Sequence, residues 1–68
     1  MAALRIRIRE FRDTLGWTQA ELAERAGIRR ATVNRIENAH VKAIDLDVLD
    51  KLARALGCEP GYLIVRER

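Results

Sequence analysis

One short stretch of this 68-residue chain contains three arginines, an asparagine and an alanine whose chemistry fits the edges of nucleic-acid bases. An arginine guanidinium matches the O6 and N7 acceptors of guanine, and an asparagine amide matches N6 and N7 of adenine. An alanine offers a methyl group that packs against the methyl of thymine. The residues concerned, Arg29, Arg30, Ala31, Asn34 and Arg35, therefore point to contacts with double-stranded DNA.

The charge of the chain is polarised along its length. Residues 25–42 hold five basic residues against the single acid Glu37, a net +4 before His40 is counted, whereas residues 43–65 are −2. The whole chain carries +3 with a pI near 9.8, which permits nucleic-acid binding. Because the positive charge is concentrated in the middle, we expect that part to face a polyanion.

The middle of the chain has the pattern of two short helices joined by a tight turn. Thr18-Gln19-Ala20-Glu21 is a capping box that begins the first helix, and Gly27 supplies the left-handed residue that ends it. Along the next helix, expected over residues 29–38, Val33 and Ile36 point inward at a spacing of three. The outer face of that helix is left cationic and amide-bearing.

Three further helices are expected around this pair. Apolar residues between Leu4 and Leu15 recur at spacings of four, three and four ahead of Gly16, which indicates an amphipathic helix. Asp45 can cap a fourth helix over residues 46–56, and Pro60 suits the first turn of a short fifth one. The sequence therefore predicts one all-α domain, a compact bundle of about five short helices.

The two ends of the chain leave a second possibility open. Residues 3–7 alternate between apolar and basic side chains, as a strand does, and residues 63–65 are β-prone. A short antiparallel pairing of the ends, within one subunit or between two, therefore stands beside a helical start. The basic residues Arg5, Arg7 and Arg9 form either a solubilising face or an arm that adds phosphate contacts.

Residues 19–38 resemble the Cro and phage-repressor type of helix-turn-helix family. That family shares the pattern Q-x-x-L-A-x-x-x-G-[IV]-x-x-x-x-[IV]-x-x-[IL]-E, all of which is present here. Arg12 ahead of Gly-Trp-Thr-Gln, and Leu-x-x-Leu-Ala-x-x-Leu-Gly at residues 49–57, extend the likeness to residues 8–65. The resemblance implies a lambda-repressor-like fold with its helix-turn-helix core at residues 18–38, whose second helix enters the major groove.

The same pattern implies structural roles. Ala23 must be small where the two helices cross, and Arg12 and Glu37 are expected to form a partly buried ion pair that joins the first and third helices. Removing one partner would leave the charge of the other buried and unpaired. The residues expected to hold the motif together are Arg12, Ala23, Gly27, Val33, Ile36 and Glu37.

Carried over position by position, the family's DNA contacts fall on the starts and outer faces of the two central helices. Gln19 would hold a phosphate, Asn38 would lie beside the phosphates, and Arg30 and Asn34 are expected to contact bases. The residues predicted to contact DNA are Thr18, Gln19, Arg29, Arg30, Ala31, Thr32, Asn34, Arg35, Asn38, His40 and Lys42.

Two positions depart from the family. Arg29 stands where a serine or threonine usually caps the third helix, and arginine cannot accept the amide bonds of a cap. Either that helix starts on a weaker cap, or Arg29 has exchanged capping for a phosphate or base contact. Ala39 replaces the glycine that normally follows, so the turn toward His40 is expected to be either tighter or longer than usual.

The function expected from these features is that of a sequence-specific transcriptional regulator, a repressor that binds DNA as a homodimer. The apolar residues near the chain end are expected to form the dimer surface, namely Tyr62, Leu63, Ile64 and Val65. The alternative is an antitoxin or adaptor whose main partner is another protein, such as a toxin or another regulator.

Other classes of function find no support in the sequence. The chain has no serine and no glycine-rich phosphate loop, and we expect neither enzymatic activity nor a cofactor. His40 and Cys58 lack companions at metal-ligand spacing, so no metal site is predicted. A single cysteine and the absence of a long apolar run favour the reducing cytoplasm over a membrane or a secreted location.

Overall fold

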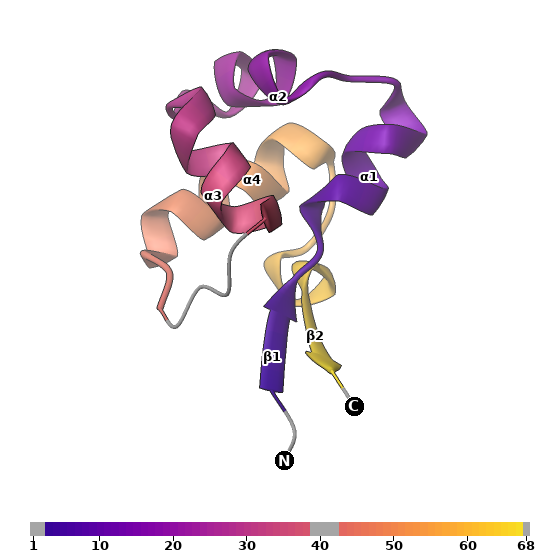
Figure 1. The fold of residues 1–68 in the computed structure, drawn as a ribbon, viewed down its shortest axis with the longest axis vertical. Coiled ribbons are helices and arrows are strands. Elements are labelled where there is room, and N and C mark those ends of the chain that lie inside the picture. Colours follow the sequence, from indigo (N-terminus) through magenta and orange to yellow (C-terminus); the bar gives the residue numbers. More distant parts are fainter. Residues whose placement is uncertain (1–2, 39–42, 68) are drawn as a thin grey trace.

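The computed structural model describes residues 3–38 and 43–67, which form four α-helices, one 3₁₀ turn and a two-stranded sheet (Figure 1). In chain order these elements are β1 Ala3–Ile6, α1 Ile8–Leu15, α2 Gln19–Ala26, α3 Arg30–Asn38, α4 Leu46–Leu56, η1 Pro60–Leu63 and β2 Ile64–Glu67. The predicted helical bundle is confirmed. The fifth helix expected at Pro60 is instead the 3₁₀ turn η1, which leads directly into β2.

The two chain ends pair with each other inside one subunit. β1 and β2 are antiparallel, with Ala3 opposite Glu67 and Ile6 opposite Ile64, and the Arg7 amide donates to the Leu63 carbonyl at 2.8 Å. Figure 1 shows this ribbon at the opposite end of the molecule from α2. Of the two possibilities for residues 3–7, the structure therefore has the strand.

Local hydrogen bonds fix both ends of α2, as the sequence predicts. Thr18 Oγ1 accepts from the Glu21 amide at 3.1 Å, and Glu21 Oε1 accepts from the Thr18 amide at 2.9 Å. At the other end Gly27 has φ +70°, and the Ile28 amide donates to the Ala23 carbonyl at 3.0 Å. This left-handed closure turns the chain so that α3 starts almost at once and crosses α2.

The core lies where α2, α3 and α4 meet, closed by the start of α1 and by η1. Its buried side chains are Ile8, Leu22, Ala23, Ala26, Val33, Ile36, Leu49, Leu52, Ala53, Leu56 and Leu63. Each helix buries one face in this core and leaves the opposite face to solvent, as amphipathic helices do.

Three apolar side chains lie elsewhere than the sequence predicts. Leu4 is 60% exposed because it belongs to β1 and not to α1, and Leu15, at the end of α1, is 45% exposed. Leu63 is fully buried in the core of its own chain. The prediction that Leu63 forms part of a dimer surface is therefore wrong, since its side chain cannot leave the core without unfolding it.

Candidate DNA-binding site

The outer face of α3 is built by the spacing of its two buried residues. Val33 is fully buried and Ile36 is 5% exposed, which fixes the rotation of the helix about its axis. The side chains of Ala31, Asn34 and Arg35 are then directed to solvent. They share this surface with Arg30 in the first turn and Arg29 just before it, both of them exposed.

Arg29 precedes α3 and contributes its backbone to the start of the helix. Its carbonyl accepts from the Thr32 amide at 3.0 Å and from the Val33 amide at 3.3 Å. Thr32 itself is half-buried. The side chain of Arg29 is exposed and remains available for a ligand.

The three arginines of this surface lack the acidic partners that several arginines of the fold have. Within the described ranges, the side chains of Arg29, Arg30 and Arg35 form no hydrogen bond or ion pair, and the first turn of α3 contains no acid. On the scaffold, by contrast, Arg54 donates to Asp50 at 2.9 Å. Exposed, unpaired cations gathered in one short segment generate a positive potential that favours a polyanion.

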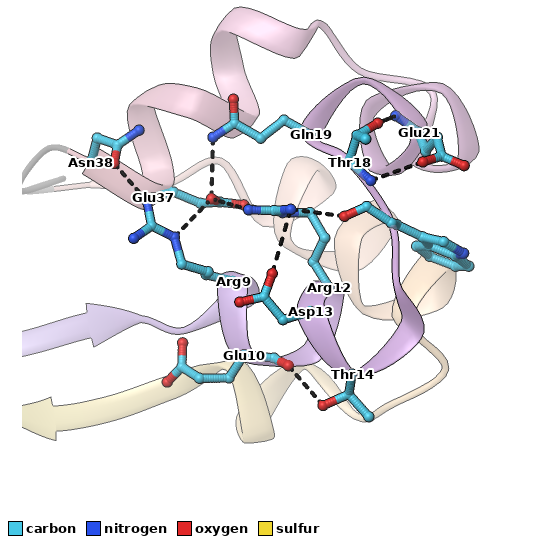
Figure 2. Close-up of polar contacts among 11 residues, drawn as sticks. Arg9, Glu10, Arg12, Asp13, Thr14, Thr18, Gln19, Glu21, Glu37 and Asn38 are labelled. Atoms are coloured by element: carbon cyan, nitrogen blue, oxygen red, sulfur yellow. Dashed lines mark hydrogen bonds and ion pairs between the residues drawn. The ribbon is translucent and has the colours of Figure 1, made fainter.

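Behind this face, the carboxylate of Glu37 is completely covered. Its side chain is 0% exposed, and that of Arg12 in α1 is 13% exposed. Arg12 Nε donates to Glu37 Oε2 and Arg12 Nη2 to Glu37 Oε1, each at 2.8 Å, while Arg12 Nη1 donates to the Trp17 carbonyl at 2.8 Å (Figure 2). The predicted ion pair between α1 and α3 is present, and it also anchors the turn before α2.

Two more residues donate to the same carboxylate. Arg9 Nε and Gln19 Nε2 both reach Glu37 Oε1, at 3.2 and 3.1 Å, and Arg9 Nη2 donates to Asn38 Oδ1 at 2.7 Å. Figure 2 shows Arg9 and Arg12 from one helix, and Gln19 from another, converging on Glu37. Glu37 therefore ties together three helices at the base of the candidate site.

This arrangement determines the protonation of Glu37. Burial by itself would raise the pKa of the carboxyl group, but hydrogen bonds from Arg12, Gln19 and Arg9 outweigh it and hold the pKa below its usual value. The hydrogen bond to Glu37 likewise raises the pKa of Arg12. Glu37 is thus an ionised carboxylate whose charge is neutralised within the protein, so its repulsion of an approaching phosphate is small.

A further hydrogen bond connects this cluster to the exposed face of α3. Asn34 Nδ2 donates to Gln19 Oε1 at 3.3 Å. The first residue of α2 thereby contacts both the buried carboxylate behind α3 and the amide on its outer surface.

The turn before α2 is held by an aromatic contact. Trp17 is half-buried against the core, and the guanidinium of Arg25 lies over its ring, 4.4 Å from the centroid. A cation above an indole face is attracted by the ring quadrupole. Trp17 therefore has a structural role, which includes holding an arginine of α2 beside the turn.

Sequence reasoning placed most of this surface but missed several of its contacts. The sequence predicts Arg9 only as part of a basic arm or solubilising face and does not predict its bonds to Glu37 and Asn38. One signal was available: Arg9 lies three residues before Arg12, and residues at that spacing share a helix face. His40 and Lys42, also predicted to contact DNA, lie outside the described residues.

The described residues show no sign of a metal site or a membrane span. None of their His, Cys, Asp and Glu side chains form a cluster of three suited to a metal ion, and none of their helices has the length and apolarity needed to cross a membrane. Burial, followed by the nearby Glu59 charge, raises the pKa of the Cys58 thiol, which disfavours the nucleophilic thiolate.

Comparison with known sequences gives related proteins over most of the chain. Residues 8–63 match a family described as helix-turn-helix. An uncharacterised HTH-type transcriptional regulator from Methanothermobacter thermautotrophicus is 45% identical over 56 residues, 82% of this chain and 80% of the relative. Another, from Archaeoglobus fulgidus, is 53% identical over 62 residues, 91% and 87% of the two chains.

A solved structure is similar as well. It is the crystal structure of the restriction-modification controller protein C.AhdI from Aeromonas hydrophila, with a TM-score of 0.76 and 37% sequence identity. The match covers 84% of this chain and 85% of that one. The fold described above is therefore that of a small helix-turn-helix controller protein.

Proposed function

This chain belongs to the Cro and phage-repressor type of helix-turn-helix family, a family of DNA-binding transcription regulators, and from that premise we propose that it represses transcription as a homodimer on a two-fold operator. α3 would enter the major groove in each half-site. The observation that carries this proposal is the surface of Arg29, Arg30 and Arg35, which are exposed and unpaired within the described ranges.

Each part of the site has a distinct task in this mechanism. Arg30 and Asn34 contact base edges, with Ala31 and Arg35 beside them, because their side chains project from the exposed face of α3. Contacts to the phosphates and sugars of the DNA set the register of the protein on the duplex but carry no sequence information. We assign these contacts to Thr18, Gln19, Thr32 and Asn38 at the edges of the motif, and to Arg29.

The amide of Asn38 is well oriented for such a phosphate contact. Because Arg9 donates to Asn38 Oδ1, the Nδ2 group, which has two N–H donors, is turned away from that guanidinium. Phosphate oxygens accept hydrogen bonds and donate none. The Arg9 contact therefore favours the orientation of Asn38 that a phosphate requires.

Dimerisation follows from the small number of base contacts. A good bidentate pair discriminates by about 1–3 kcal/mol against the wrong base, and one α3 helix offers two or three such residues. Two copies on an inverted repeat double this discrimination. We propose that they meet through Tyr62, which is 61% exposed, together with the half-buried Ile64 and Val65. Occupation of a promoter by the dimer would then repress transcription.

The experiment that tests this function is selection of bound sites from random duplex DNA at near-physiological salt. We expect an inverted repeat with half-site centres ~10 bp apart, or a multiple of one helical turn. Recovery of only weak, strongly salt-dependent binding without a motif would contradict specific recognition, and would favour an antitoxin or adaptor whose main partner is a protein.

The dimer is tested separately by sedimentation of the free protein. Tyr62→Asp should shift the protein toward monomer. Leu46→Asp, which changes the 80% exposed leucine at the start of α4, should not. A wild-type protein that sediments as a monomer both alone and on its selected DNA would refute the dimer.

A further inference from the structure

The contacts of Gln19 and Asn34 determine more than the position of these side chains. An amide group has a donor end and an acceptor end, and which end faces a ligand depends on what the other end contacts. Here the contacts form a continuous series from the buried carboxylate of Glu37, through Gln19, to Asn34 on the DNA-facing surface.

The orientation of Gln19 follows from the carboxylate. Ionised Glu37 can only accept hydrogen bonds, so the end of Gln19 that faces it at 3.1 Å must be the Nε2 donor. The other end, Oε1, must then point toward α3. Because the Glu37 side chain is 0% exposed and held by Arg12, it keeps Gln19 in this orientation.

The orientation of Asn34 follows in turn. Gln19 Oε1 is an acceptor, so Asn34 must offer Nδ2 to it, at 3.3 Å. One of the two Nδ2 hydrogens is thereby occupied. Within the described part of the chain the side chain of Asn34 makes no other hydrogen bond, which leaves one N–H donor and the Oδ1 acceptor for a ligand.

We propose that Gln19 is a specificity-determining positioning residue, which orients Asn34 so that it accepts adenine and excludes guanine at one position of each half-site. Adenine presents one donor, N6, and one acceptor, N7, in the major groove, which matches the remaining pair on Asn34. Guanine presents two acceptors, O6 and N7. To satisfy both, Asn34 would need the N–H that Gln19 occupies.

This inference rests on the proposed function but has a separate test. The first measurement uses the free protein: Gln19→Met keeps the size of the side chain and removes its hydrogen bonds. In ¹⁵N–¹H correlation spectra, the side-chain amide signals of Asn34 should move on this substitution, and those of Asn38, bonded to Arg9, should not. Unchanged Asn34 signals would overturn the orienting role whether or not the protein binds DNA.

The second measurement compares affinities for the selected site with duplexes that carry each base at each position, at one fixed salt concentration. Asn34→Ala should reduce the preference for adenine over guanine at one position by about 5- to 150-fold, the value of one bidentate contact. Gln19→Met should reduce the preference for adenine over guanine at the same position and leave the base preferences at the other positions unchanged. Asn38→Ala, an amide of the same helix outside this series of contacts, should weaken all duplexes equally.

The outcomes separate the two claims. If wild-type protein selects a motif but Gln19→Met lowers the affinity for every base by the same factor, Gln19 is a phosphate contact only and the inference fails while the proposed function stands. If wild-type protein selects no motif, the proposed function fails. Circular dichroism of each variant establishes that the helices are retained.

Discussion

The ion pair between Arg12 and Glu37 gives the most direct test of how the site is supported. Replacing Arg12 by methionine keeps most of the aliphatic volume and removes three hydrogen bonds, two to Glu37 and one to the Trp17 carbonyl. Glu37, which is 0% exposed, cannot turn to water without opening the contact between α1 and α3. Arg12→Met should therefore leave a buried charge that lacks its best partner.

The magnitude follows from the burial of both groups. Removing one partner of a buried pair costs about 3–5 kcal/mol, and we take the lower end, ~3 kcal/mol, because Arg9 and Gln19 still donate to Glu37. For a domain of this size each kcal/mol lowers the Tm by about 4–8 °C. The expected fall in Tm is therefore about 12–24 °C.

Thermal and urea unfolding followed by circular dichroism measure this change. A domain of this length has a total stability of about 3–10 kcal/mol, so an osmolyte such as TMAO should be included to refold a variant that is unfolded in buffer. The double variant Arg12→Met/Glu37→Met should recover ~1–2 kcal/mol, because no buried charge remains.

A matched control separates burial from the mere loss of an ion pair. Arg54 also donates to a carboxylate, Asp50, at 2.9 Å, but its side chain is 81% exposed, so Arg54→Met should cost about 0.5 kcal/mol or less. The reasoning fails if Arg12→Met is no more destabilising than Arg54→Met. It fails equally if the double variant is less stable than Arg12→Met alone.

Three further results are expected. The pKa of Glu37 is depressed in the folded state, so the contribution of its carboxylate to stability is complete above the ordinary pKa of 4.5 and is lost as the pH falls through the lower folded pKa. In urea unfolding from pH 7 to pH 3, the unfolding free energy of the wild type should therefore fall more steeply than that of Glu37→Gln. Parallel curves for the two proteins would contradict this. Gly27→Ala should destabilise by ~1 kcal/mol in the same assay, through backbone strain at φ +70° and not through a clash, since a Cβ there meets nothing within 4 Å; an unchanged or raised unfolding free energy would exclude that strain. Arg30→Ala should relax the preference at a single base position of the selected site in a competition assay, whereas equal loss on all duplexes would make Arg30 a phosphate contact.

Features that depend on neighbouring residues in the chain were predictable from the sequence. The capping box at Thr18, the cap at Asp45 and the glycine that ends α2 are all present, because each involves residues no more than a few positions apart. The rotation of α3 also followed from the spacing of Val33 and Ile36. These local rules predicted which face of α3 would be exposed, and so most of the candidate site.

Features that depend on how the elements pack were not predictable in the same way. The periodicity of the first apolar residues continued smoothly from Leu4 to Leu15, yet Leu4 joins β1, since its strand finds a partner at the other end of the chain. Leu63 was predicted to form an interface as a member of the apolar run at residues 62–65. Its burial depends on η1 folding back over α4, which no local pattern encodes.

The sequence by itself determined the four α-helices, the caps at Thr18 and Asp45, the exposed cationic face and, through resemblance to a family, the pairing of Arg12 with Glu37. Only the tertiary structure decided that Arg9 and Gln19 donate to the carboxylate of that pair and that Gln19 accepts a hydrogen bond from Asn34. The physical reason is that a hydrogen bond requires the position and direction of both groups. For side chains on different helices, these are set only when the helices pack together.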